Sequence, residues 1–178
     1  IISIGALVES DKGIVFSYEK YNSKGTMLEE KVGSLETKKI KEIHSRGSMG
    51  NLFYYEGDLH AVGLKNRFDW PTNTSILKIS RDGKVSFKDR TFDRNVVKAE
   101  VNNSVLYFLY EDSGKTLLRD GTNNIDLIDA EITVKDFAFN NDKTYVIANS
   151  FSKPDEVYEL DNGQLEKTSK ANEFFNKK

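Results

Sequence analysis

The sequence contains no cysteine, and this absence excludes disulfide bonds and thiolate metal sites. Only two histidines occur among 178 residues, so a metal centre would have few imidazole ligands. No apolar run approaches the roughly 18 residues of a membrane-spanning helix. The formal net charge of -2 offers no excess of basic residues for nucleic acid or an anionic membrane. We therefore expect no metal, no cofactor, no nucleic acid and no membrane as partners, and we predict a cytoplasmic location.

The composition is otherwise that of a folded chain. Hydrophobic residues make up 38% of the sequence and charged residues 30%. Eleven phenylalanines, eight tyrosines and one tryptophan argue against disorder, because disordered segments are poor in side chains of this size. The chain starts with Ile1-Ile2-Ser3-Ile4, without methionine or a signal-peptide pattern, which is typical of the middle of a strand. We therefore expect a fragment of a longer protein.

A unit of four short strands joined by polar turns recurs four times along the sequence. The inner turns of the four copies lie at Lys12, Gly57, Asn103 and Asn141. The steps between them are 45, 46 and 38 residues, close to the roughly 40 to 50 residues of a four-stranded propeller blade. This repeat predicts an all-β chain, a partial or truncated β-propeller of about four antiparallel blades. The expected blades are approximately residues 1–46, 47–93, 94–131 and 132–172.

Turn chemistry and strand composition support the same fold. Asp82-Gly83 and Asn162-Gly163 suit tight outer hairpins, because glycine and, less readily, asparagine tolerate positive φ. Residues 105–109 and 145–148 are apolar at successive positions, as expected for inner strands that are covered on both faces. A generic β-sandwich also has short strands and frequent turns, but the four-strand repeat favours the propeller.

Two further patterns are assigned to loops and strand edges. Pro71 and Pro154 are expected in loops between second and third strands, since proline cannot donate to a strand ladder. The carboxylate pairs Glu29-Glu30, Glu111-Asp112 and Asp155-Glu156 consist of adjacent residues, which point to opposite faces of a strand. We therefore interpret them as solvated charges rather than as paired catalytic acids.

A search for catalytic motifs finds no complete apparatus. His44 is expected near the end of a fourth strand and His60 within a second strand, and neither has a nucleophile motif beside it. The segment Arg46-Gly47-Ser48-Met49-Gly50 differs from the G-x-S-x-G nucleophile elbow, because Arg46 replaces the first glycine and a strand follows instead of a helix. We interpret this segment as a linker between blades and predict no catalytic, cofactor-binding or metal-binding residue.

One loop has the composition of a contact surface. The segment Lys65–Pro71 is basic and aromatic and contains the only tryptophan of the chain. Tryptophan and arginine are common anchors of binding surfaces. Arg67, Phe68 and Trp70 are therefore our candidate contact residues. The alternative is that Trp70 packs between blades as part of the core.

The fourth copy resembles a known family. Residues 134–150, followed by Ser152-Lys153-Pro154-Asp155-Glu156-Val157-Tyr158, are similar to the last propeller blade of the prolyl oligopeptidase family, particularly its acylaminoacyl peptidase branch. In that family a Ser-x-Pro-x-Glu-[Leu/Val]-Tyr segment precedes a turn and a Leu-Thr-x-x-Asn-like tail. The tail here is residues 167–174, with Lys167 in place of the usual leucine. Residues 101–118 resemble the preceding blade, although Lys115 and Leu118 differ from its Gly-Arg-x-x-Leu-Tyr pattern.

The resemblance implies a function that depends on a second domain. In this family the chain continues after such a tail into an α/β-hydrolase domain that holds the catalytic serine, aspartate and histidine. Since the sequence ends at Lys178, we expect the hydrolase domain to be absent from it, and no catalytic residue of the family has a matching position. The family's propellers usually have seven or eight blades, so earlier blades are expected to be missing as well.

The expected function is therefore that of the non-catalytic propeller portion of a serine peptidase, a hydrolase, in which the propeller controls the access of peptides to the active site. Its partners would be the α/β-hydrolase domain of the same parent chain and a peptide substrate. An alternative is a stand-alone propeller module that binds a peptide or protein partner. Four blades could also close into a small propeller, or open arcs could self-associate through their exposed blade faces.

Overall fold

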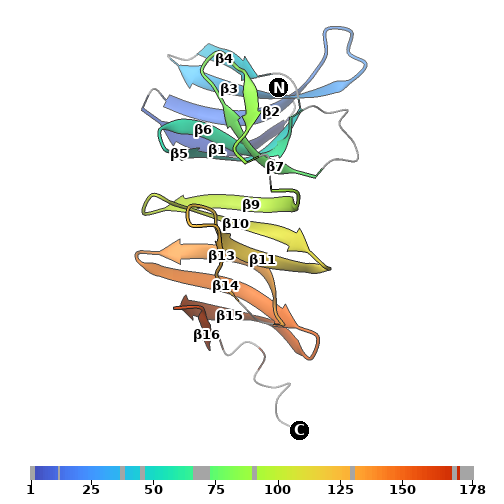
Figure 1. The fold of residues 1–178 in the computed structure, drawn as a ribbon. Coiled ribbons are helices and arrows are strands. Elements are labelled where there is room, and N and C mark those ends of the chain that lie inside the picture. Colours follow the sequence, from blue (N-terminus) through green and yellow to red (C-terminus); the bar gives the residue numbers. More distant parts are fainter. Residues whose placement is uncertain are drawn as a thin grey trace. The chain divides into compact units, whose positions relative to one another are not determined.

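The computed structural model describes residues 3–11, 13–36, 39–44, 47–65, 73–89, 92–128, 131–169 and 172. These residues form strands, turns and short connections, and none of them is helical (Figure 1). The strands make four separate four-stranded antiparallel sheets, as the sequence repeat predicts. Within this part of the chain there is no helix of the length and apolar character needed to cross a membrane.

Each sheet is a meander in which the strand order follows the order along the chain. The first sheet contains β1 (Ser3–Ser10), β2 (Gly13–Tyr21), β3 (Leu28–Glu36) and β4 (Lys39–His44). The second contains β5 (Ser48–Tyr55), β6 (Asp58–Leu64), β7 (Ser75–Ile79) and β8 (Val85–Phe87). The third contains β9 (Asn95–Asn102), β10 (Val105–Asp112), β11 (Lys115–Asp120) and β12 (Ile125–Asp126). The fourth contains β13 (Thr133–Asn140), β14 (Lys143–Ser150), β15 (Lys153–Asp161) and β16 (Gln164–Lys167).

The turns that link these strands depend on residues that accept positive φ. Asn141 has φ 55° in the β13–β14 turn, and Asn162 and Gly163 have φ 46° and 79° in the β15–β16 turn. In the β7–β8 turn, Gly83 has φ 79°, and a Cβ at this position would lie 2.2 Å from the carbonyl oxygen of Ile43 on β4. Glycine is therefore required there both by the backbone conformation and by the close approach of the neighbouring sheet.

An irregularity recurs in the first strand of three sheets. The register shifts by one extra residue between Ile4 and Leu7 on β1, between Met49 and Leu52 on β5, and between Val134 and Asp136 on β13. Such a bulge bends the strand and increases its twist. Its repetition at corresponding places strengthens the interpretation of the sheets as copies of one unit.

The chain divides into two compact units, Ile1–Ser104 and Val105–Lys178. In the first unit, sheets one and two pack face to face. Their shared core contains Val15 and Val32 from the first sheet and Met49, Leu52, Leu59, Ala61, Leu77 and Ile79 from the second. The other side of the second sheet contacts β9, where the Ala99 amide donates to Oδ1 of Asn51 at 2.6 Å. Both faces of the second sheet are thus covered within this unit.

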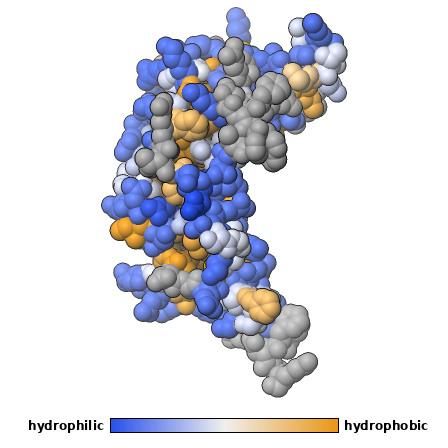
Figure 2. Space-filling view, turned by 45° about the vertical axis from the view of Figure 1, so that its right-hand side comes forward, coloured by the Kyte–Doolittle hydropathy of each residue, from blue (hydrophilic) through white to orange (hydrophobic). Residues whose placement is uncertain are grey.

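The second unit has its own core. It contains Leu109, Leu118, Ile128, Val134, Phe137, Val146 and Ala148, with the rings of Tyr107, Phe139 and Tyr158 packed against them. Phe137 and Phe139 meet edge to face, with ring centroids 5.5 Å apart. On the face drawn in Figure 2, hydrophilic side chains predominate and the apolar patches are separate. The inner strands β2, β6 and β10 are buried at several successive positions, as expected for strands that are covered on both faces.

The expectation for Pro154 was wrong. It lies inside β15, not in a loop. Ser150 pairs with Lys153 and Ala148 pairs with Glu156, so the register shifts between them and Pro154 stands in the irregular part of the ladder. A bulge tolerates proline because no regular ladder bond needs its missing N–H. Pro71 lies outside the described residues.

Candidate functional site

A cavity of about 910 Å³ lies in the first unit between its two stacked sheets. The turns after β1, β5 and β7 contribute to its rim, and β3 and β4 contribute to one wall. Its floor is apolar and includes the buried side chains of Val15, Leu59 and Ile79. The volume is within the range of small-molecule and peptide side-chain pockets.

Carboxylates dominate the described lining of this cavity. The acidic lining residues are Glu9, Asp11, Glu36, Glu42, Asp58 and Asp82, and the basic ones are Lys41 and Arg81. Lys31, Lys78 and Lys84 pair with three of these six carboxylates, so together with Lys41 and Arg81 they leave only a small excess of negative charge around the cavity. An apolar floor below charged walls suits a ligand that has an aliphatic stem and a cationic head, such as a lysine or arginine side chain.

Lysines of the same unit form ion pairs with three of these carboxylates, which are Asp58, Asp82 and Glu42. Lys78 donates to Asp58, and this bond holds the pKa of Asp58 below its usual value. Nζ of Lys84 lies 2.8 Å from Oδ2 of Asp82, and hydrogen bonds from Lys84 and Ser80 strongly lower the pKa of Asp82. Both carboxylates are therefore ionised at neutral pH and keep their negative charge.

Glu42 belongs to a polar cluster beside the cavity. Nζ of Lys31 lies 3.0 Å from Glu42 and 3.3 Å from Glu29, and Lys31 is 7% exposed. Burial alone would lower the pKa of Lys31, but hydrogen bonds and attraction from the two carboxylates raise it overall. Burial and the charge of Glu42 raise the pKa of Tyr18 on the adjacent strand. The cluster keeps a buried ammonium charged because its counter-charges are in contact with it.

His60 is a core residue of the second sheet. Its ring stacks on Phe53 with centroids 5.6 Å apart and meets Tyr55 edge-on at 5.9 Å. Nδ1 lies 3.0 Å from the Asp58 carbonyl oxygen, to which it donates. Burial lowers the pKa of His60, and the bond to Asp58 offsets this only in part. The ring is therefore neutral near pH 7.

The structure places Ser48 and His60 apart. Ser48 pairs with Leu64 and His60 pairs with Phe53, so the two residues are separated by four residues, about 13 Å, along β6. A nucleophile and its base must be within hydrogen-bond reach. Nδ1 of His44 lies 2.9 Å from the Gly83 carbonyl oxygen, to which it donates. Ser48 starts a strand and does not stand at a strand-to-helix turn.

The remaining sequence predictions concern the contact loop, metal binding and the carboxylate pairs. The candidate contact residues Arg67, Phe68 and Trp70 lie outside the described residues. Within the described ranges, the histidines, aspartates and glutamates form no group of three that could hold a metal ion. The expectation that Asp155 and Glu156 are both solvated was wrong, because Glu156 is buried.

Sequence reasoning missed the cavity. Each contributing turn is polar and unremarkable when taken alone. The spacing of the repeat was the available signal, since it places Asp11 and Asp82 in turns, and Asp58 directly after a turn, at the same end of their sheets. Adjacent copies that each have acidic turns at one end predict a shared acidic rim.

No family model matches this chain, and no curated protein matches it in sequence. Solved structures do match. The acylaminoacyl peptidase of Pyrococcus horikoshii, in its orthorhombic crystal form, aligns with a TM-score of 0.76 and 15% identity over 96% of this chain and 28% of its own. The β-propeller domain of the Trilobed protease from Pyrococcus furiosus, described as having an open velcro topology, aligns with a TM-score of 0.71 and 12% identity over 93% of this chain and 54% of its own.

The chain thus spans 28% and 54% of the two solved chains. At such low identities the likeness concerns the fold. The four sheets are β-propeller blades, and the resemblance to the prolyl oligopeptidase family that the fourth repeat indicated is confirmed at the level of structure.

Proposed function

We propose that this chain is the propeller portion of a serine peptidase of the prolyl oligopeptidase or acylaminoacyl peptidase type, and that it controls which peptides reach a hydrolase domain of the same parent protein. The observation that carries the proposal is the alignment of 96% of the chain with an acylaminoacyl peptidase at a TM-score of 0.76. The Ser-x-Pro-x-Glu-Val-Tyr segment at 152–158 supports it independently, because it is read from the residues alone.

Control of access would be steric. Stacked sheets with fully buried cores resist deformation, because packed interiors are dense and have few voids. Short or unfolded peptides would pass such a barrier, and folded proteins would not. The acidic cavity would add a preference for peptides with basic side chains, since its carboxylates raise the local concentration of cations.

The intact parent protein tests this proposal against the chain alone. Both are assayed with an acyl-aminoacyl p-nitroanilide and with a folded protein substrate. We expect the parent to hydrolyse the short substrate, to spare the folded protein, and to be labelled by a fluorophosphonate at a serine outside this chain. We expect no turnover from the chain alone. Turnover by the chain alone that is lost on Ser48→Ala would refute the proposal.

Steric control has a separate test in the parent protein. Leu77 is fully buried between the first two sheets, and its truncation loosens their packing. We expect Leu77→Ala to increase cleavage of a long polypeptide relative to the p-nitroanilide, because the barrier opens more often while the hydrolase is unchanged. An unchanged ratio would contradict control by the propeller. The exposed Leu7 provides a matched control, since Leu7→Ala removes the same atoms without affecting that core.

A second candidate function is a propeller module that binds a basic peptide without catalysing a reaction. The acidic cavity with its apolar floor is the observation that favours it. Fluorescence anisotropy with a labelled lysine-rich peptide and a glutamate-rich peptide distinguishes specific binding from none. A module of this kind binds the first peptide, loses most of the binding on Asp11→Asn combined with Glu36→Gln, and has no hydrolase sequence in its parent gene.

A further inference from the structure

The segment after the last strand of the fourth sheet meets a buried carboxylate. Glu156 on β15 is 5% exposed and pairs with Ala148 on β14, which in turn pairs with Val134 on β13. Ala148 and Val134 are fully buried in the core of the second unit. A carboxylate in such a row is unfavourable unless other groups pair with its charge.

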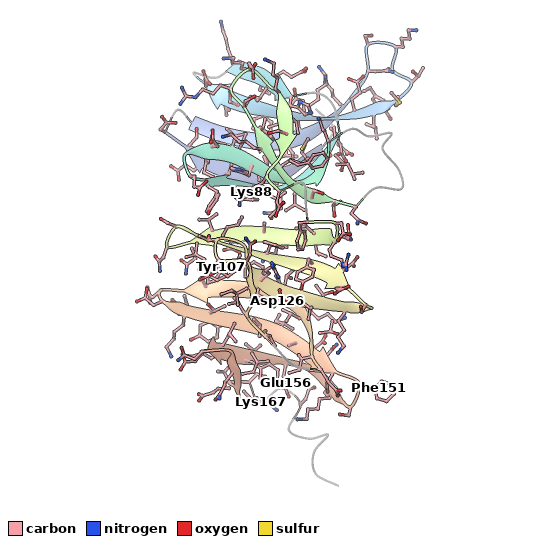
Figure 3. All side chains as sticks on the ribbon, in the orientation of Figure 1. Lys88, Tyr107, Asp126, Phe151, Glu156 and Lys167 are labelled. Carbon is pink, nitrogen blue, oxygen red and sulfur yellow. The ribbon has the colours of Figure 1, made fainter. Side chains whose placement is uncertain are left out.

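The partners of Glu156 come from one short stretch of chain. Nζ of Lys167 lies 2.7 Å from its Oε1, and the hydroxyl of Ser169 donates to its Oε2. Nearby, Nδ2 of Asn172 donates to the carbonyl oxygen of Asp155 at 2.7 Å. The bonds from Lys167 and Ser169 lower the pKa of Glu156 and keep it ionised. Figure 3 shows Glu156 and Lys167 side by side at the end of the fourth sheet.

Further bonds hold the same stretch along β15. The regular ladder ends where Tyr158 pairs with Lys167. Beyond it, the Thr168 amide donates to the Val157 carbonyl at 2.9 Å, and the Val157 amide donates to the hydroxyl of Ser169 at 3.1 Å. A side-chain oxygen thus takes the place of a main-chain acceptor, so the segment continues along the strand only while Ser169 is held in position.

We propose that Glu156 is a clasp that fastens Lys167, Thr168 and Ser169, the segment at the end of the β15–β16 hairpin, to β15. Glu156 and the segment that contacts it depend on each other. Detachment of the segment leaves a carboxylate buried without its partners, and loss of the carboxylate leaves Lys167 and Ser169 without their acceptor.

Lys167 supplies the positive charge that the clasp requires. A leucine at this position would leave Oε1 of Glu156 without an ammonium partner. The lysine side chain is 34% exposed, and its Nζ reaches the buried carboxylate.

Hydrogen exchange of single amides, followed by NMR on the whole chain, tests the clasp. The Thr168 and Val157 amides are the reporters, because neither of them bonds to Glu156. In Glu156→Gln we expect both to exchange at least tenfold faster, while amides of β10 and β11 keep their protection and show that the unit is folded. Glu159→Gln is the matched control, since Glu159 pairs with Lys143 at 2.6 Å and not with the segment.

Two results would overturn the proposal. One is unchanged protection of Thr168 and Val157 in Glu156→Gln, and the other is equal loss in the Glu159→Gln control. Should Glu156→Gln fail to fold, Lys167→Leu addresses the same contact from the other side. It must release the Thr168 amide by a similar factor for the proposal to stand.

Discussion

Replacement of Gly83 by alanine tests how closely the first two sheets approach each other. Gly83 has φ 79°, and its missing Cβ would lie 2.2 Å from the Ile43 carbonyl oxygen of the neighbouring sheet. Gly57 has nearly the same φ, 78°, in a turn of the same sheet, and a Cβ there would meet nothing within 4 Å. The pair Gly83→Ala and Gly57→Ala therefore separates backbone strain from the contact between sheets.

Backbone strain is common to both variants. A non-glycine residue in the left-handed region costs about 1 to 2 kcal/mol. Loss of glycine also reduces the conformational freedom of the unfolded chain, which returns about 0.4 to 1 kcal/mol. We therefore expect Gly57→Ala to lower the free energy of unfolding by about 1 kcal/mol or less.

The contact is specific to Gly83. A normal contact requires the turn and β4 to separate by about 1 Å, because Cβ and oxygen approach no closer than about 3.2 Å. This displacement disturbs the 2.9 Å bond from His44 to the Gly83 carbonyl and the 2.8 Å bond from the Gly83 amide to Ser80. Each bond contributes about 1 kcal/mol. We expect Gly83→Ala to lower the free energy of unfolding by about 3 kcal/mol.

Urea unfolding followed by circular dichroism measures both values. The difference between the variants, about 2 kcal/mol, is the quantity that depends on the stacking of the two sheets. Equal losses for Gly83→Ala and Gly57→Ala would refute the close approach, because the turn strain would then account for everything. A change in the slope with urea would instead indicate an altered unfolded state.

Three further outcomes follow from the same structure. Leu77→Ala removes a fully buried side chain and should lower the free energy of unfolding by about 3 to 5 kcal/mol, whereas Leu7→Ala, at 60% exposure, should cost less than about 1 kcal/mol in the same urea titration. The pKa of His60 is lowered in the folded state, so the unfolded state binds the proton first as the pH falls. The free energy of unfolding should therefore decrease as the pH drops below about 6.5. Melting curves of His60→Leu should lack this part of the pH dependence. In the parent protein of the proposed peptidase function, Ser48→Ala should leave kcat/KM for a short substrate unchanged, and a loss of a hundredfold or more would show that Ser48 takes part in the chemistry.

Local signals in the sequence were enough to predict the strands and their turns. The inner turn at Asn141 and the outer turn at Asn162-Gly163 have the positive φ that their residue types predict. Each of these turns is determined by neighbours a few positions away, so the sequence carries the information directly. The recurrence of the unit then predicts the propeller, because each sheet needs another sheet to cover its apolar face.

Features that depend on distant partners were not predictable in this way. From the sequence alone, Glu156 is interpreted as a solvated member of an acidic pair. The β15–β16 hairpin brings Lys167 and Ser169 into contact with it, and the sequence does not indicate this contact. Pro154 looks like a loop residue until the bulge opposite it is seen. The acidic cavity combines turns from two repeats, and no single turn has a motif. In each case the determining contact lies between segments whose spacing is a property of the fold.

The repeated bulge in the first strands bears on how this chain arose. An extra residue between Ile4 and Leu7, between Met49 and Leu52, and between Val134 and Asp136 is an irregularity that no strand needs for pairing. Three separate origins at matching places are harder to explain than one origin followed by duplication. The three blades that share the bulge would then descend from one ancestral unit, whose turns and surface charges diverged while the bulge was kept. A chimaera that exchanges whole blades would carry the bulge with each blade, so the strand register within each blade would be kept.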